Sequence, residues 1–183
     1  MKPHPAFASI EFSSVPAGLF AADALLKKSP IGLIRTGTIG GGKFLILLAG
    51  STASVAEAHE EALFHGGLQV ADDAFLPDIH PALYDALLGN VRQMGDGPLL
   101  IFETPTVSCN IQAIERAMKG VPVTLIEFRT GGAQLGGRGL SILQGDLYDI
   151  EAAQEIALSS LETRGIPAQH RVLLLITDGA NTS

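Results

Sequence analysis

Residues 35–50 read RTGTIGGGKFLILLAG and place three consecutive glycines before Lys43. Gly37, Gly42 and Lys43 fit the phosphate-binding pattern G-x-x-x-x-G-K, which continues with Ser or Thr and then a helix. The next residue is instead Phe44, which begins a short, continuous apolar run of the length of a buried strand. The stretch therefore predicts a glycine loop that joins two strands, and it disfavours nucleotide binding.

The composition limits the class of protein. A chain of 183 residues holds one ordinary domain or two small ones. It is 46% hydrophobic with a mean hydropathy of +0.31, yet no apolar run approaches the roughly 18 residues of a membrane span, and we expect no secretory signal. This excess of apolar residues predicts a core plus contacts with partner subunits. The net charge of −7 disfavours nucleic acid, and a single cysteine excludes an internal disulfide and suits a reducing cytoplasm.

The chain contains an internal repeat. Residues 10–35 align without a gap with residues 102–127 at an offset of 92, which places Lys27 on Lys119. Beyond the glycine loop the offset becomes 95, and Lys43 falls on Arg138. The second loop is therefore three residues longer than the first. We call the two copies the first half and the second half.

A third echo closes each half, LPDIH at 76–80 and IPAQH at 166–170. The polar, glycine-rich segment GNVRQMGDG, residues 89–97, is the expected linker. It divides the chain into domains 1–90 and 91–183. The segment after the final echo, residues 172–183, is left open: its apolar start suits either an added strand or a cover for a neighbour's edge.

Both halves have the same predicted order, β-α-β-β-α-β. In the first half we expect strands at 7–12, 31–36 and 44–50 and helices at 17–28 and 52–66. In the second half we expect strands at 99–104, 123–128 and 140–145 and helices at 108–119 and 148–165. The segment that contains the closing echo completes each half. Thr106 or Ser108 is the expected cap of the helix at 108–119. This order predicts an α+β fold of two tandem ferredoxin-like (split βαβ) units.

The ordered motifs resemble the bacterial microcompartment (BMC) shell domain. Its A-D-A-x-x-K helix, glycine pore loop and A-V-x-x-A helix are matched by AADALLKKSPIGLI (21–34), TIGGGKFLILLAG (38–50) and ASVAEAHEEA (53–62). The second half supplies AIERAMKGVPVTLI (113–126), LGGRGLSILQGD (135–146) and DIEAAQEIA (149–157). The resemblance covers residues 7–170 and is to the unpermuted tandem-domain shell proteins of the propanediol-utilisation type.

This resemblance implies a structural protein and no enzyme. Such chains form homotrimers that imitate a hexamer and tile with other shell proteins into hexagonal sheets around encapsulated enzymes in the bacterial cytoplasm. Small metabolites are then expected to pass a central pore, with neither nucleic acid nor membrane as a partner. The main alternative is an oligomeric ferredoxin-like regulatory protein that binds a small molecule at its glycine loops, because the fold alone does not decide function.

The resemblance also assigns a pore. Glycine lets backbones approach closely and adopt positive φ, which a crowded symmetry axis requires. The expected pore-loop residues are Thr38, Ile39, Gly40, Gly41 and Gly42 in the first half and Gln134, Leu135, Gly136 and Gly137 in the second. Because the two loops differ in length, the pore is expected to be three-fold. Lys43 and Arg138 follow the loops and are candidates for a cationic rim, or else are ordinary charges at strand ends.

Some shell proteins of this type carry a cysteine in the first loop, where three thiolates hold an iron–sulfur cluster. Gly40 occupies that position here, and Cys109 lies at the start of a second-half helix. We therefore expect no cluster, no other cofactor and no metal site. Cys109 is expected to pack as a small hydrophobe, and His59 and His65 lack the H-E-x-x-H spacing of a zinc site.

The remaining candidates belong to the edge of the tile. Lys27 and Lys119 match the family's edge lysine, and the alternative is a solvated i,i+4 pair with Asp23 and Glu115. His80 and His170 end the closing echoes, where we expect a structural hydrogen bond at the tile edge in place of catalysis.

Overall fold

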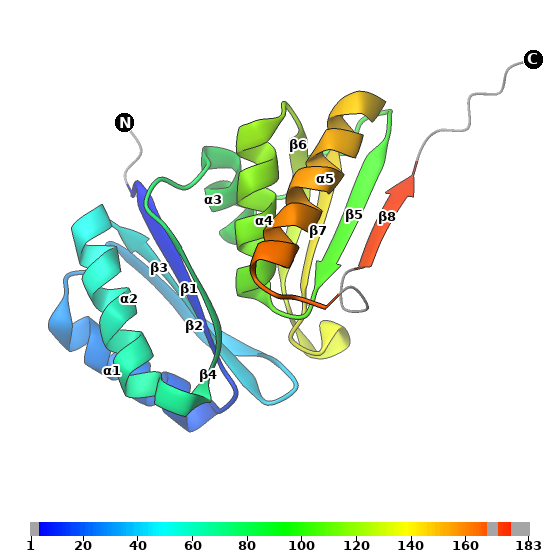
Figure 1. Cartoon of the computed structure of the whole chain (residues 1–183). Coiled ribbons are helices and arrows are strands. Elements are labelled where there is room, and N and C mark those ends of the chain that lie inside the picture. The colour runs from blue at the N-terminus through cyan, green and yellow to red at the C-terminus, as the bar shows by residue number, and fades with distance from the viewer. Residues whose placement is uncertain (1–3, 168–171, 177–183) are drawn as a thin grey trace, which may run out of the picture.

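The computed structural model describes residues 4–167 and 172–176. The chain forms two antiparallel four-stranded sheets with helices packed on them, arranged as two neighbouring halves (Figure 1). Every helix within the described residues is too short or too polar to cross a bilayer.

The first half follows the predicted order. It consists of β1 (Ala6–Phe12), α1 (Val15–Lys28), β2 (Leu33–Gly40), β3 (Lys43–Gly50), α2 (Thr52–Gly66), the 3-10 turn η1 (Gly67–Gln69) and β4 (Val70–Leu76). The strands lie in the order β2-β3-β1-β4. The apolar run after the glycine loop is therefore the buried strand β3, as expected. The hydroxyl of Ser51 caps α2 by accepting a hydrogen bond from the Ser54 amide at 3.1 Å.

The second half repeats this topology after a short additional helix, α3 (Pro81–Leu87). It consists of β5 (Leu99–Thr104), α4 (Val107–Gly120), β6 (Thr124–Thr130), the 3-10 turn η2 (Ala133–Leu135), β7 (Gly139–Gln144), α5 (Leu147–Thr163) and β8 (Val172–Ile176). The strand order β6-β7-β5-β8 matches that of the first sheet, which confirms the ferredoxin-like plan. Of the two candidate caps of α4, the structure selects Thr106, whose hydroxyl accepts from the Cys109 amide at 3.2 Å.

The pairing of the last strands corrects the third echo. Phe7 pairs with Leu76, and its counterpart Leu99 pairs with Ile176, so the last strands correspond at an offset of 100. LPDIH therefore follows its strand, whereas IPAQH precedes β8. The two histidines are not equivalent, because sheet pairing and not the shared letters sets the register; His170 itself lies outside the described residues. The open question about 172–183 is answered in part, since Val172–Ile176 forms β8, the last strand of the second sheet and the counterpart of β4.

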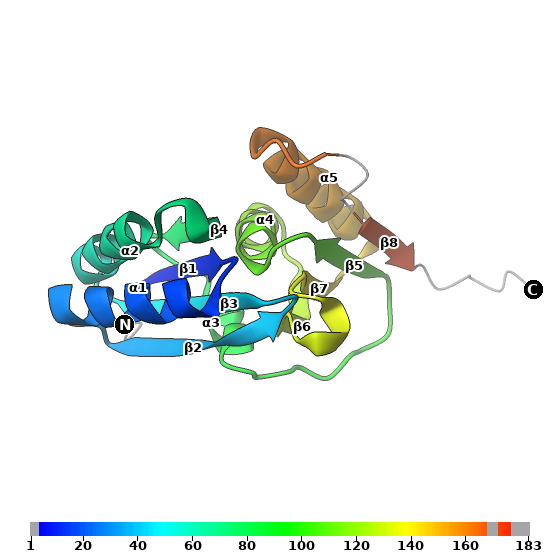
Figure 2. The same cartoon turned by 90° about the horizontal axis from the view of Figure 1, so that it is seen from below.

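The halves meet where α4 lies against the first sheet. Helices α1 and α2 cover one face of that sheet, and α4 packs against β1 and β4 from the other (Figure 2). One hydrophobic cluster consequently includes residues of both halves, among them Phe7 and Leu47 of the first sheet and Ile111 and Ile114 of α4. We call this contact of α4 with β1 and β4 the seam.

Candidate functional site

The first glycine loop is a tight hairpin turn between β2 and β3. Gly40, Gly41 and Gly42 have φ angles of 93°, 60° and 75°, in the left-handed region that disfavours other residues. The run of glycines is therefore required by the backbone of the turn itself.

The second loop, between β6 and β7, is longer and differently folded. Gly131, Gly132, Gly136 and Gly137 all have positive φ angles, and the turn η2 lies between the two glycine pairs. The three inserted residues predicted from the change of offset are accommodated in this region.

The fold brings the two loops together, as Figure 1 shows for the β2–β3 hairpin and η2. The Gly132 amide donates to the Ile39 carbonyl at 2.8 Å. A Cβ atom on Gly40 would lie 2.5 Å from the Gly132 carbonyl oxygen, and one on Gly131 would lie 2.9 Å from the Ile39 Cβ. Glycine is therefore needed at Gly40 for its φ angle and for this close approach.

The predicted pore-loop residues differ in exposure. Ile39 and Gly137 are buried between the loops, whereas Thr38, Gly41, Gly42, Gln134 and Gly136 are exposed. Gly40 and Leu135 are intermediate. The exposed residues are mainly glycines, and they include two polar side chains, those of Thr38 and Gln134.

The two cations that follow the loops are both engaged. The Lys43 ammonium of the first half donates to the Pro105 carbonyl of the second half at 3.3 Å. The Arg138 guanidinium lies 2.6 Å from the Glu103 carboxylate within the second half. The side chain of Arg138 remains 59% exposed, so this pair is solvated on one side.

A polar network crosses the seam. The carboxylate of Asp72 in β4 accepts hydrogen bonds from the Thr106 hydroxyl and the Arg164 guanidinium of the second half. The Glu115 carboxylate in α4 accepts from the His80 amide at 3.0 Å. These bonds tie β4 and the segment after it to α4 and to the end of α5.

The predicted edge residues fall in two places. Lys27 forms an exposed pair with Asp23 at 2.6 Å on the surface of α1. Lys119 instead lies at the seam, where it contacts Glu115 at 2.6 Å and donates to the Asp78 carbonyl. The Nδ1 of His80 accepts from the Ala82 amide at 3.2 Å and so caps α3, a structural hydrogen bond.

Removal of the Asp72 carboxylate tests the seam. The side chains of Arg164 and Asp72 are only 20% and 14% exposed, and breaking a fully buried pair costs about 3–5 kcal/mol. Because this pair is partly solvated, Asp72→Ala is expected to lower the free energy of unfolding by about 2 kcal/mol in urea denaturation.

The matched control for that variant is Asp23→Ala, which removes the exposed pair with Lys27. It is expected to cost less than about 0.5 kcal/mol. Equal losses for the two variants would contradict a role of Asp72 in joining the halves.

Glu11 is a buried carboxylate that the sequence analysis did not single out. It lies in β1 at 0% exposure, and its Oε1 accepts from the Ser108 amide at 2.7 Å across the seam. The pKa of Glu11 is raised to about 7, mainly by burial and also by the charge of Asp72, against the opposing effects of the Ser108 hydrogen bond and of Lys43. The sequence feature that could have indicated a buried carboxylate is the one charged residue within the expected strand FASIEF (7–12).

The Cys109 thiol and the imidazoles of His59 and His65 each have a structural setting in the described part of the chain. Burial raises the pKa of the Cys109 thiol to about 11, so the thiol stays protonated and packs in the core. His59 contacts Asp73 at 2.9 Å, which lowers the pKa of Asp73, and His65 contacts Glu61 at 3.0 Å. No group of three metal-ligating side chains occurs among the described residues.

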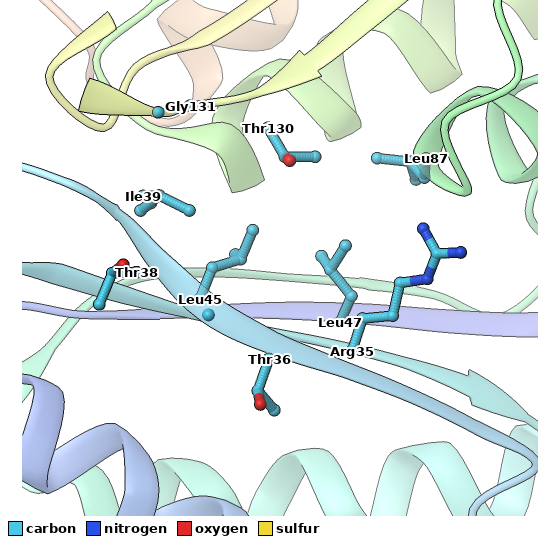
Figure 3. Close-up of a pocket in the computed structure, with 11 residues that line it drawn as sticks. Arg35, Thr36, Thr38, Ile39, Leu45, Leu47, Leu87, Thr130 and Gly131 are labelled. Carbon is cyan, nitrogen blue, oxygen red and sulfur yellow. The ribbon is translucent and has the colours of Figure 1, made fainter. Parts of the chain in front are cut away.

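A pocket of about 280 Å³ lies beside the paired loops. Leu45 and Leu47 on the first sheet face Thr130 and Leu87 across it, with Ile39 at the loop end (Figure 3). The Arg35 guanidinium extends toward α3 and donates to the Leu88 carbonyl at 3.0 Å. The pocket therefore lies between β2 and β3 on one side and β6 and α3 on the other.

The repeated fold, the paired glycine loops and the seam define a class. The BMC domain family model matches residues 6–79, which span the first half. The chain is also 30% identical over 164 residues to the bacterial microcompartment shell protein PduT of Citrobacter freundii, covering 90% of this chain and 89% of that protein. The chain belongs to the bacterial microcompartment shell proteins and is of the PduT type. It is thus assigned to the shell of a compartment in the bacterial cytoplasm.

Solved structures extend the similarity to both halves. A microcompartment protein from Desulfitobacterium hafniense DCB superimposes with a TM-score of 0.78 at 27% identity, covering 93% of this chain and 94% of that chain. A fused permuted hexameric shell protein of the RMM microcompartment gives a TM-score of 0.62 at 20% identity, covering 86% of this chain and 84% of that chain. The latter likeness concerns the fold alone. Shell proteins of this family are structural and assemble into oligomers and sheets.

Proposed function

We propose that this chain is a structural, non-enzymatic tile of the shell facet, a homotrimer that imitates a hexamer around a central metabolite pore. Residues 1–90 and 91–183 serve as its two BMC domains. The observation that supports the pore is the contact of the two glycine loops: each chain presents both loops side by side, and three chains would gather six of them around one axis. The exposed peptide groups of Gly41, Gly42 and Gly136 would then line the opening.

The loops do not fit an iron–sulfur cluster. A cluster needs thiolate ligands, and the chain has one cysteine. Cys109 is 0% exposed in the hydrophobic cluster that includes residues of both halves, so its sulfur is not available to meet two other copies on an axis. We propose a pore without a cluster, whose solute contacts are peptide groups, Thr38 and Gln134.

Membership of the shell family favours a tile over the regulatory ligand-binding protein. Lys27, exposed on α1, is proposed to contact neighbouring tiles; Lys119 and His80 are proposed to support the same edge from the seam. Light scattering tests the trimer: a molar mass near three times 19.1 kDa is expected, with flat hexagonal arrays in electron micrographs at higher concentration. A monomer that forms no arrays, or a discrete oligomer whose melting temperature shifts with a nucleotide or amino acid, would contradict the tile.

The charge of Lys43 is proposed to favour anionic metabolites at the pore, together with Arg138. Lys43→Ala is therefore expected to lower the ratio of anion to cation flux through the reconstituted pore. The reduction should be modest, because the Lys43 ammonium is held by the Pro105 carbonyl. Unchanged flux of both ions would remove Lys43 from the rim.

A further inference from the structure

Gly37 is a glycine that neither the backbone nor the packing of the chain requires. It lies in the interior of β2, where it pairs with Leu45, and its φ angle is not positive. A Cβ atom placed on it would meet nothing within 4 Å. The irregular pairing of β2 begins only after Thr38, so a bulge does not account for this glycine. The remaining reason for glycine inside a strand is the close approach of another group, and the open space at Gly37 belongs to the pocket of about 280 Å³.

Arg35 lies beside this space without a carboxylate partner. Side chains alternate along a strand, so Arg35, Gly37 and Ile39 share one face of β2. In Figure 3 the side chains of Arg35 and Ile39 project from β2 toward the pocket, and that of Thr36 projects away from it. The Arg35 guanidinium donates one hydrogen bond, to the Leu88 carbonyl, and forms no ion pair with any carboxylate of the described residues. Most of its N–H donors therefore remain for a ligand.

The second half shows what these two positions can otherwise contain. The pairing of β2 and β6 with their neighbouring strands makes Glu127 the counterpart of Arg35, and Arg129 the counterpart of Gly37. In the second half these two side chains form an ion pair at 2.7 Å. In the first half one position carries a cation without a carboxylate partner, and the other carries no side chain. The space at Gly37 is thus the place where an anion would meet Arg35.

The other walls of the pocket are mostly apolar and come from both halves. Leu45 and Leu47 of β3 and Leu87 of α3 are buried side chains that face the pocket, and Thr130 of β6 adds a hydroxyl group (Figure 3). The volume of about 280 Å³ lies just below the roughly 300–1,000 Å³ of pockets that hold drug-sized ligands, so the pocket suits a smaller molecule. An aliphatic chain fits the leucines, and a carboxylate fits Arg35, whose planar guanidinium can bind both carboxylate oxygens.

We propose that this pocket is a binding site for a small monocarboxylate with a short aliphatic chain. The carboxylate pairs with Arg35 over the backbone of Gly37, and the chain lies against the leucines of the pocket. All of these residues belong to one chain, so binding does not depend on the proposed trimer.

Equilibrium dialysis of the full chain against radiolabelled butyrate tests the site, with the ionic strength held constant by sodium chloride. We expect saturable binding of one butyrate per chain, with a Kd on the order of 1 mM for so small a ligand. As a competitor, n-butylamine has the same chain with the opposite charge and should not displace butyrate. Both n-butanol, which lacks the charge, and acetate, which lacks most of the chain, should bind at least about tenfold more weakly.

Variants of the two central residues locate the binding. Gly37→Leu places a side chain in the pocket and should abolish binding. Arg35→Gln should weaken binding at least about tenfold, because hydrogen bonds to a charged group are lost. Arg35→Lys should weaken it less, since it keeps the charge but cannot bind both oxygens in one plane. Arg129→Gln is the matched control: it alters the counterpart of Gly37, which lies outside this pocket, and should leave the affinity unchanged.

The outcomes separate this site from the proposed tile. Absence of saturable binding to the wild type, or equal affinity of the wild type and Arg35→Gln, would overturn the site and leave the tile. A monomer that binds butyrate would overturn the tile and leave the site. Circular dichroism checks that each variant folds; if Gly37→Leu does not fold, Arg35→Gln decides alone, because the side chain of Arg35 is exposed.

Discussion

Gly40→Val is expected to lower the free energy of unfolding by about 3–4 kcal/mol and to separate the two glycine loops. Positive φ costs a residue with a Cβ roughly 1–2 kcal/mol, and forced overpacking adds about 1–3 kcal/mol. Both apply at Gly40, whose φ is 93° and whose Cβ would lie 2.5 Å from a backbone oxygen of Gly132. Chemical denaturation at fixed protein concentration measures the loss.

Gly89→Val is the control for that experiment. Its φ of 94° matches that of Gly40, but a Cβ there would have no neighbour within 4 Å. It should therefore show only the backbone cost, about 1–2 kcal/mol. Equal losses for the two variants would mean that the loop contact contributes nothing.

Glu11→Gln is expected to flatten the dependence of stability on pH. The folded-state pKa of Glu11, about 7, exceeds its ordinary value of 4.5, so the folded protein binds this proton more tightly than the unfolded chain. The contribution of Glu11 to the free energy of unfolding is therefore fully present below about pH 4.5 and is lost as the pH rises through about 7. The shift corresponds to a loss of about 3 kcal/mol for the wild type above that pH.

Melting curves from pH 4.5 to 8 measure this effect. Once the pH dependence contributed by all other titrating groups is subtracted, the stability of Glu11→Gln should not change with pH. Glu103→Gln serves as the matched variant, because Glu103 is the repeat counterpart but is paired with Arg138 and is not buried in the seam. If Glu11→Gln retained the full wild-type slope, the seam carboxylate would not be the titrating group.

The internal repeat made most of the fold predictable. Helix 52–66 and strand 99–104 have the predicted bounds, because each is a periodic segment between clear turn signals. The added helix α3 was missed: it lies between the closing echo at 76–80 and the expected linker at 89–97, in a stretch that the repeat alignment did not cover. The equivalence of LPDIH (76–80) and IPAQH (166–170) was wrong, because similar residues in two short segments carry no information on how the neighbouring strands pair.

The site was predictable only in part. The runs of glycine predicted the two turns, because backbone with a positive φ angle favours glycine. The change of the repeat offset from 92 to 95 located the longer loop. The contact between the loops, the burial of Glu11 and the placement of Lys119 at the seam all depend on how one half packs on the other. That packing is a long-range property that neither half encodes in its local pattern, and only the structure provides it.

The most direct test is an electron cryomicroscopy reconstruction of the purified protein. We expect three chains closed around one axis, with the loops at 38–42 and 134–137 at its centre. A reconstruction with these loops on the outer rim, or with chains that do not close around a common axis, would contradict the proposed pore.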